Sequence, residues 1–237
     1  VDIVDENNTG LFFNMDEPST IAGKIERLRN DKEVRGRLTR NAFEIVKKRF
    51  NLYQMLRKTG DLYTSLAPDL SVSESMRIGI NASKYFGANT GVWRYTSNLC
   101  RHLPKSEDGN VYYFYLPGRS SNRKELKKRE QGKQRMFLQN NTLRILWEQI
   151  FLPLKIRNDK LDLFHYTDHA MSLIQRMPLV VITVHDIAYI RFPNLLNKSR
   201  QIYKKNILNL SIKKADVILT DSHSTKRDII EFFKVDE

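Results

Sequence analysis

The hydrophobic pattern of the sequence changes at Met76, and this change constrains the fold more than any other feature. Before Met76, apolar residues recur at helical spacing, as Ile21, Ile25 and Leu28 do. After it, short apolar runs alternate with helical segments. Strands that alternate with helices indicate parallel pairing, because a helix normally supplies the crossover between parallel neighbours. The second part of the chain therefore predicts an open α/β sheet.

The same patterns predict the individual elements. Residues 1–13 read as a short strand and turn, and three helices follow, the first beginning at Pro18. Pro68 and three serines make residues 67–75 a predicted linker. The strands expected after it are 77–82, 111–116, 161–166, 179–184 and 217–220. The clearest helices expected between them are 92–103, 143–156 and 198–214.

The charge of the chain is divided unevenly. Residues 1–66 carry 12 Lys/Arg and 10 Asp/Glu, whereas residues 76–237 carry 28 Lys/Arg and 15 Asp/Glu. The positive net charge of +13 therefore comes from the second part of the chain. Such a charge attracts anions without choosing among them. The single Cys100 excludes a disulfide framework within the chain and fits a reducing compartment. No apolar run approaches the roughly 20 residues of a membrane-spanning helix.

The stretch from Arg119 to Arg135 contains 8 basic and 2 acidic residues. Leu126 is its one clearly apolar residue, and no aromatic residues are interleaved. It therefore lacks the stacking rings of single-strand binders and the apolar face of an inserting helix. A solvated loop or helix is the preferred interpretation, and contact with anionic lipid is the alternative.

A glycine loop, Gly87 to Gly91, lies between the first strand and the first helix of the second part. Glycines let the backbone approach a ligand, and the amides at the start of a helix can hold a phosphate. A third glycine at the spacing of the dinucleotide fingerprint is absent, and so is the Gly-Lys-Ser/Thr ending of a nucleoside-triphosphate loop. A plain tight turn remains an equal alternative.

His185 and Asp186 directly follow the apolar strand 179–184. The carboxyl ends of strands in an open α/β sheet face the ligand crevice, so this imidazole could bind a substrate hydroxyl or move a proton. A histidine that caps the next turn is the alternative.

Two further groups of polar residues follow strands. His165 and His169 flank Asp168, but no further ligand pattern supports a metal site there. The segment from Asp221 to Ser224, which includes Ser222, follows the last strand and favours a helix cap over a nucleophile site.

Several segments together resemble a known family, namely Met76–Asn81, Thr90–Tyr95, Leu146–Gln149 with Leu152-Pro153, Leu161–His165, Thr183–Ile187 and Ala215–Ser222. They are similar, in the expected order, to the amino-terminal half of family 4 (group 1) glycosyltransferases, and most similar to the mannosyltransferase-like group. Residues 1–66 resemble the carboxyl-terminal end of another such module. The resemblance implies a fragment with a helical tail (1–66), a linker (67–75) and a Rossmann-like, truncated acceptor domain (76–237) of the GT-B architecture.

The resemblance also implies the chemistry. Such enzymes transfer a sugar with retention from a nucleotide sugar such as GDP-mannose, usually without a metal or other cofactor. His185 would contact the sugar near the reaction centre, and Asp186 would hold the loop or the histidine. The residues expected to bind substrate are Gly87, Thr90, Gly91, Arg94 and Ser222.

The family's donor-binding Arg/Lys pair and spaced glutamates belong to the other half, so we expect this polypeptide alone to be inactive. The expected parent is a tandem enzyme of surface polysaccharide synthesis, such as lipopolysaccharide, with a glycan or lipid-linked acceptor. It would be cytoplasmic, with peripheral contact at the anionic inner membrane face and no nucleic acid partner. The alternatives are a non-catalytic module that binds polyanions or membranes and, less favoured, a nicotinamide-dependent oxidoreductase.

Overall fold

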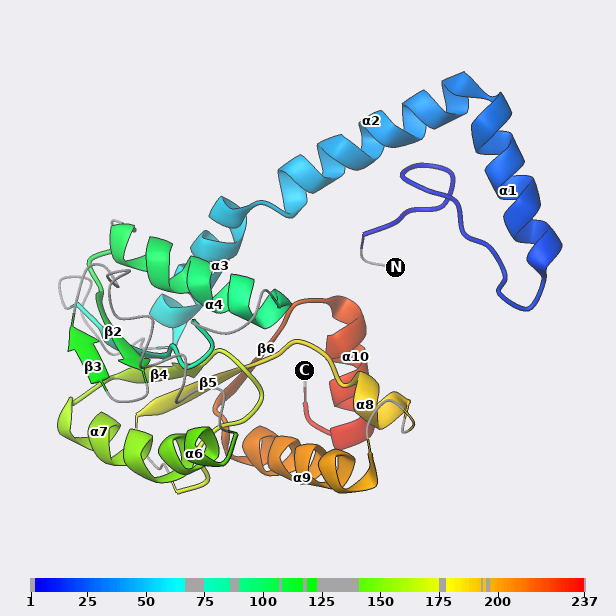
Figure 1. Ribbon diagram of the computed structural model, residues 1–237. Helices are drawn as coiled ribbons and strands as arrows, with labels where there is room; N and C mark the ends of the chain where they lie inside the picture. Colours follow the sequence, from blue (N-terminus) through cyan, green and yellow to red (C-terminus); the bar gives the residue numbers. More distant parts are fainter. Residues whose placement is uncertain are drawn as a thin grey trace. The chain divides into compact units, whose positions relative to one another are not determined.

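The computed structural model describes residues 3–66, 75–85, 90–106, 108–116, 119–122, 141–174, 178–192, 194 and 197–236 (Figure 1). Contacts divide the chain into two units, Val1–Lys58 and Thr59–Glu237. The predicted linker lies almost wholly outside the described residues, so its role as a module boundary remains a prediction.

The first unit is helical, as its sequence predicts. Helix α1 runs over Pro18–Asn30 and α2 over Lys32–Arg49. Proline suits the first turn of α1 because the fixed proline angle is already helical. The Asp31 carboxylate caps α2 by accepting a hydrogen bond from the amide of Val34 at 2.9 Å. Helix α3, Leu52–Ser65, begins in this unit and ends in the second.

The strand predicted within residues 1–13 is wrong for the described part, residues 3–13. Three successive amides there donate hydrogen bonds to the carbonyl of Asp5 and form a turn. A single isolated bridge joins Glu6 and Gly10. A strand needs a neighbour to satisfy its backbone, and the described residues of the first unit offer none.

The second unit contains a six-stranded sheet in the order β3-β2-β1-β4-β5-β6. Strands β1, β2, β4, β5 and β6 run parallel to one another, and the edge strand β3 is antiparallel to β2. The strands are β1 (Arg77–Asn81), β2 (Val111–Leu116), β3 (Arg119–Asn122), β4 (Leu163–Tyr166), β5 (Leu179–Val184) and β6 (Val217–Thr220). The predicted Rossmann-like α/β class is confirmed.

Helices cover both faces of this sheet. Figure 1 shows α4 over one face and α6, α7 and α9 over the opposite face. Their bounds are α4 (Gly91–His102), a short 3-10 turn (Leu103–Lys105), α6 (Asn141–Leu146), α7 (Leu152–Asn158), α8 (Ala188–Arg191), α9 (Lys198–Lys214) and α10 (His223–Phe233). The position of α9 matches the prediction residue for residue.

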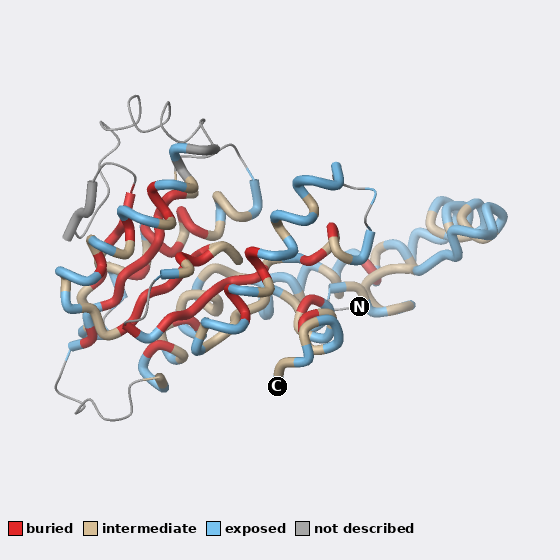
Figure 2. The backbone as a smooth tube through the Cα atoms, turned by 90° about the horizontal axis from the view of Figure 1, so that it is seen from below, coloured by how far each residue is buried: buried red, intermediate tan, exposed pale blue. Residues whose placement is uncertain are grey.

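The main core lies between the sheet and the α6, α7 and α9 layer. Phe164, Tyr166 and Ile182 of the sheet pack there with Leu152 and Leu208 of the helices. Figure 2 shows the buried residues concentrated in the strands of the second unit. Strands that are buried on both faces read as nearly continuous apolar runs, and β5 (LVVITV) fits this pattern more closely than β4 (LFHY), which contains the buried His165.

Two details differ from the expectation. The helix predicted over 143–156 contains a π-helical stretch, Trp147–Phe151, between α6 and α7. The start of the basic stretch, expected as loop or helix, forms β3 because the edge of β2 offers it a partner. The rest of that stretch lies outside the described residues.

Candidate active site

Strands β1, β4, β5 and β6 end at the same edge of the sheet because they are parallel. The register pairs Val184 with Thr220, so His185 and Asp221 follow on adjacent strands. Ligands of open α/β sheets bind in the crevice outside the carboxyl ends of the strands. This edge is therefore the candidate site of the second unit.

His185 is held through both nitrogens of its ring. Its Nδ1 lies 2.5 Å from Oδ2 of Asp221, and its Nε2 lies 3.0 Å from the carbonyl oxygen of Thr167. A carbonyl oxygen and a carboxylate can only accept, so each nitrogen donates when both hydrogen bonds are formed. The arrangement therefore selects the doubly protonated, cationic imidazolium.

The charge balance around His185 agrees with this geometry. Burial lowers the pKa of His185, but the hydrogen bond and charge of Asp221 raise it, with smaller contributions from the Thr167 carbonyl and Asp168. The net pKa lies above the ordinary value of 6.5. A cation that is 12% exposed at a strand end can stabilise a negative charge on a ligand or donate a hydrogen bond to a sugar hydroxyl.

A buried chain of hydrogen bonds lies next to His185. The Tyr95 ring packs edge-on against the His185 ring, with centroids 5.1 Å apart. The Tyr95 hydroxyl lies 3.1 Å from Oγ1 of Thr183, which lies 2.7 Å from Nε2 of His165. The chain ends at the hydroxyl of Tyr63 in α3, 2.6 Å from Nδ1 of His165. The last turns of α3 are thus linked to the candidate site through the interior.

His165 is the neutral counterpart of His185. It is fully buried, and desolvation together with the charge of His185 lowers its pKa to about 3. A neutral imidazole has one donor and one acceptor nitrogen, and both nitrogens have hydroxyl partners that can take either role. His165 therefore works as a structural bridge, and among the described residues no cluster of three metal-ligating side chains occurs.

Asp168 follows β4 and forms an ion-paired group beside His185. Its carboxylate lies 3.1 Å from Nζ of Lys84 and 2.7 Å from Nδ1 of His169. Burial alone would raise the pKa of Asp168, but these two partners hold it well below its usual range. Asp168 is therefore ionised and occupied by its neighbours.

Three of the predicted site residues begin α4. Thr90 caps this helix, with its hydroxyl accepting from the amide of Trp93 at 3.2 Å, and Gly91 is its first residue. Arg94 is exposed and forms no ion pair with any residue that the structure describes. Gly87 lies outside the described residues. The positive end of α4 and the Arg94 cation suit an anionic ligand.

Asp186 and Ser222 both hold local structure. Asp186 is exposed and accepts a hydrogen bond from the amide of Ala188 at 3.1 Å, so it fixes the turn into α8. Ser222 caps α10 by accepting from the amide of Thr225 at 3.1 Å, as the cap interpretation predicted. Of the two roles that the sequence left open for Asp186, the contact is to the loop, and Asp221 takes the role of partner to His185.

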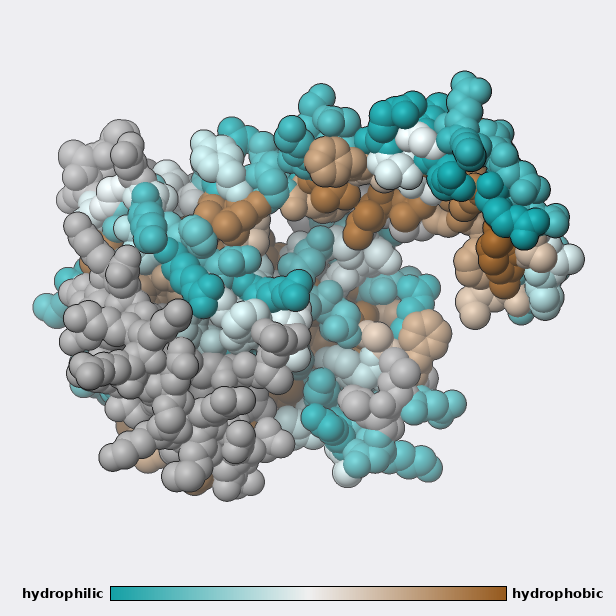
Figure 3. Space-filling view, turned by 45° about the horizontal axis from the view of Figure 1, so that its top comes forward, coloured by the Kyte–Doolittle hydropathy of each residue, from teal (hydrophilic) through white to brown (hydrophobic). Residues whose placement is uncertain are grey.

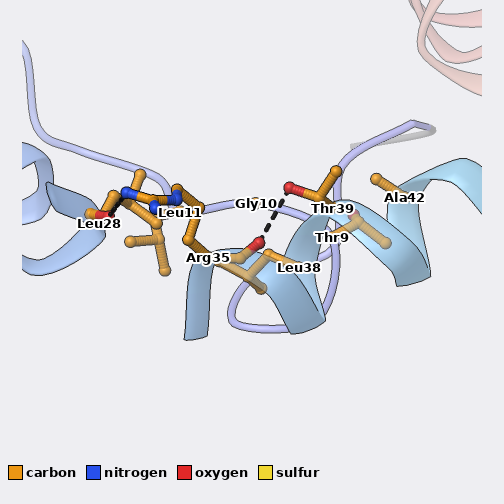
Figure 4. A pocket seen from close by; sticks show the side chains of 8 residues that line it. All are labelled: Thr9, Gly10, Leu11, Leu28, Arg35, Leu38, Thr39 and Ala42. Carbon is orange, nitrogen blue, oxygen red and sulfur yellow. Dashed lines mark hydrogen bonds between the residues drawn. The ribbon is translucent and has the colours of Figure 1, made fainter. Parts of the chain in front are cut away.

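A pocket of about 330 Å³ lies in the first unit, between the turn that precedes α1 and one side of α2 (Figure 4). Its polar groups are used locally: the Arg35 guanidinium donates to the Leu28 carbonyl, and the Thr39 hydroxyl donates to the Arg35 carbonyl. None of the predicted site residues lines it. We assign no ligand to this pocket.

Sequence reasoning missed the contacts that Asp221, Thr167 and Tyr95 make with His185. Asp221 could have been predicted from the sequence, because it directly follows β6 just as His185 directly follows β5. Thr167 contributes a backbone carbonyl, for which side-chain motifs give no signal. Tyr95 lies in α4, and the residues that contact it depend on how this helix packs against the sheet.

A protein-family model described as Glycosyltransferase Family 4 matches residues 89–237. This range includes His185, Asp221, Tyr95 and Thr167. Comparison with curated proteins and with solved structures gave no match. Within the described part of the chain, no helix is both long and apolar enough to cross a membrane.

Proposed function

Because the chain belongs to glycosyltransferase family 4, we propose that residues 76–237 form the acceptor half of a retaining, mannosyltransferase-like enzyme. The proposed donor is a nucleotide sugar such as GDP-mannose, and the acceptor is a glycan or a lipid-linked glycan. The reaction would serve surface polysaccharide synthesis, lipopolysaccharide being one example, in the cytoplasm. No metal or other cofactor takes part in the proposal.

The observation that carries the proposal is the pair of hydrogen bonds made by the His185 ring. The ring stands at the ligand edge of the sheet, and both of its nitrogens donate, to Asp221 and to Thr167. A nitrogen that is already protonated cannot accept a proton, so we assign His185 the role of a cationic hydrogen-bond donor rather than a base. Released from the Thr167 carbonyl, its Nε2–H could bind a sugar hydroxyl beside the reaction centre.

The surroundings of His185 support an anionic leaving group. Helices α4 and α10 begin shortly after β1 and β6, so both present their positive ends at the edge where these strands finish. Thr90, Gly91 and Arg94 would lie beside the donor phosphates, and Gly87, outside the described residues, is proposed to bind substrate as well. Ser222 would contribute through the start of α10. A departing nucleoside diphosphate needs such stabilisation, and we propose that a second, donor-binding domain supplies most of it.

The test is sugar transfer by the protein in which this segment is joined to a donor-binding domain. We expect His185→Ala to lower kcat by about 100-fold or more, because a donor at the reaction centre is lost. His102→Ala, in the last turn of α4, is the matched control and should keep normal turnover. Thermal unfolding of both variants verifies that they fold.

Unchanged transfer by a folded His185→Ala variant would remove His185 from the mechanism. The identity of the donor is tested by measuring transfer from a set of nucleotide sugars. The proposal requires that GDP-mannose is used in preference to nucleotide sugars with another base or another sugar. The chain of residues 1–237 alone should show no turnover with any of these donors, and turnover by it would contradict the need for a separate donor half.

A further inference from the structure

The helical segment 141–158 of the second unit is apolar on two sides, and only one side is covered. Trp147, Leu152 and Ile156 face the core and are at most 4% exposed. The apolar residues that remain largely exposed on this segment are Leu143 (41%), Leu146 (43%), Ile150 (43%), Phe151 (54%) and Leu154 (55%). A helix at the surface of a globular protein normally carries polar residues on its outer side, so this face calls for an explanation.

The exposed residues form one continuous stripe. Leu143, Leu146, Ile150 and Leu154 are spaced by three or four residues, which places them along one side of a helix. At the α-helical rise of 1.5 Å per residue the stripe would be about 17 Å long, and the π-helical stretch within it shortens it slightly. That is too short to cross a bilayer, but it suits a helix that lies in the plane of a membrane surface. We call Leu143, Leu146, Ile150, Phe151 and Leu154 the outer stripe.

A neighbouring loop extends the outer stripe. The amide of Leu173 donates to Oε1 of Gln149 at 3.0 Å, which holds this loop against the π-helical stretch. The next residue, Ile174, is 60% exposed. The carbonyl of Leu173 also accepts a hydrogen bond from Nζ of Lys214, so a cation stands at this edge.

Basic side chains lie at the end of α7, which carries part of the outer stripe, and at the end of α9, whose Lys214 contacts Leu173. Arg157 and Lys160 are exposed at the end of α7, and Lys213 and Lys214 are exposed at the end of α9. Residues 76–237 as a whole carry 28 Lys/Arg against 15 Asp/Glu. Cations around an apolar stripe match the two parts of an anionic lipid surface, its headgroups and its acyl chains.

We propose that the outer stripe and Ile174 insert into the surface of an anionic lipid bilayer, while Arg157, Lys160, Lys213 and Lys214 bind the lipid headgroups. The charge favours a membrane over a second copy of this chain, because two copies that met at this face would bring like charges together. It favours a membrane over nucleic acid because the exposed apolar residues are mainly aliphatic and offer few rings for stacking. The proposal does not depend on the sugar-transfer assignment.

The test is flotation of the full 237-residue chain with vesicles. We expect binding to vesicles of phosphatidylcholine with about 30% phosphatidylglycerol, and little binding to phosphatidylcholine alone. Raising the salt from about 0.1 M to about 0.5 M should weaken binding, because it screens the headgroup contacts.

The decisive variant combines Leu143→Gln, Leu146→Gln, Ile150→Gln and Leu154→Gln. We expect it to lose about tenfold or more of the affinity for anionic vesicles, because apolar insertion is removed. The matched control changes three apolar residues of the first unit with comparable exposure, namely Ile25→Gln (60%), Phe43→Gln (63%) and Val46→Gln (46%). This control should bind as the unchanged chain does.

An environment-sensitive fluorophore keeps the test independent of the folding of that variant. In a Cys100→Ala background, a probe on Ile150→Cys should brighten and shift to shorter wavelength with anionic vesicles, whereas a probe on Phe43→Cys should not. Absence of vesicle binding, or equal responses of the two probes, would overturn the proposal. A self-association of the unchanged chain that only the outer-stripe variant abolishes, without lipid binding, would instead identify the face as an interface between copies.

Discussion

At the scale of single residues, the histidines His185 and His165 differ in charge, because the contacts of His185 favour the cation whereas His165 is neutral. His185 donates to a carboxylate and a carbonyl, whereas His165 lies among hydroxyls in the interior. The rings are chemically identical, so the difference comes from their partners and their burial. This contrast gives two predictions that need no knowledge of the substrate.

The first prediction concerns Asp221. Asp221→Asn removes the charge that raises the pKa of His185, so we expect this pKa to fall while burial continues to lower it. Because the folded pKa of His185 lies above 6.5, the stabilisation from its protonation is fully present below pH 6.5 and is lost as the pH rises through the folded pKa. The variant should therefore lose stability mainly on the acid side.

Histidine NMR titration and unfolding at several pH values measure both effects. Asp186→Asn is the control, since Asp186 accepts from the amide of Ala188 instead of the histidine. A pKa of His185 that stays unchanged in Asp221→Asn, or that falls equally in both variants, would refute the assignment of Asp221.

The second prediction concerns the buried end of the hydrogen-bond chain. Tyr63→Phe leaves Nδ1 of His165 without a partner in a fully buried site, whichever tautomer the ring adopts. The expected loss is about 1–3 kcal/mol in the free energy of unfolding. Tyr53→Phe, in the same helix and 72% exposed, should change it by less than about 0.5 kcal/mol. Equal effects of the two changes in denaturant unfolding would disprove the role of the Tyr63 hydroxyl.

At the scale of elements, the close pairing of β1 and β4 depends on a missing side chain. Gly79 pairs with Phe164, and a Cβ at Gly79 would lie 2.4 Å from Cδ2 of Phe164 and 2.5 Å from Cδ1 of Leu161. The Phe164 ring and the Leu161 side chain therefore occupy the space that a side chain at Gly79 would need.

We expect Gly79→Ala to destabilise the second unit by about 1–3 kcal/mol, because the packed side chains must shift. Gly91→Ala is the comparison, since nothing lies within 4 Å of a Cβ there and helices favour alanine. Its stability should stay equal or rise. Thermal or denaturant unfolding decides, and a Gly79→Ala variant as stable as Gly91→Ala would contradict the steric argument.

The sequence predicted most elements of the second unit because their patterns are strong and local. The buried strands β4 and β5 are short and mostly apolar, and α9 begins after a capping Asn197. Elements that depend on distant partners were not predicted. β3 exists because β2 has a free edge, and the π-helical stretch Trp147–Phe151 places Glu148 inside, where its carboxylate accepts from the Ser83 hydroxyl at 2.9 Å.

In the candidate site, too, local features were predicted and contacts between distant residues were not. His185 was predicted because it directly follows a strand. Its partners were not, because Asp221 lies 36 residues away along the chain and acts through strand register. Tyr63 lies 102 residues from His165, and no local pattern links them. Sequence patterns thus locate the ligand edge, whereas the hydrogen bonds that set the charge of His185 require the fold.

At the scale of the whole molecule, the two units differ in how much they bury. Within the described part of the chain, α1 buries no residue and α2 buries Leu38, whereas β5 buries all of its residues except the first. Figure 3 shows apolar atoms exposed along the helices of the first unit, where Ile25 and Phe43 are 60% and 63% exposed. Local stability follows buried contacts.

We therefore expect backbone amides of α1 and α2 to exchange hydrogen for deuterium much faster than those of β1, β4 and β5. Hydrogen exchange followed by mass spectrometry resolves these segments. Equal protection of α1 and β5 would show that the first unit has stabilising contacts other than those described. The α3 segment from Thr59 to Tyr63 should be protected like the sheet, since both of these residues are buried.

The burial of Tyr63 decides where this protein can be cut. A gene trimmed at the predicted linker, residues 67–75, would encode the sheet without Tyr63, and its product would keep a vacant hole beside His165. A fragment that begins at or before Thr59 retains the hydroxyl that fills this place. Anyone who isolates the sheet for crystallisation, or transplants it into a chimeric enzyme, should carry the last turns of α3 with it.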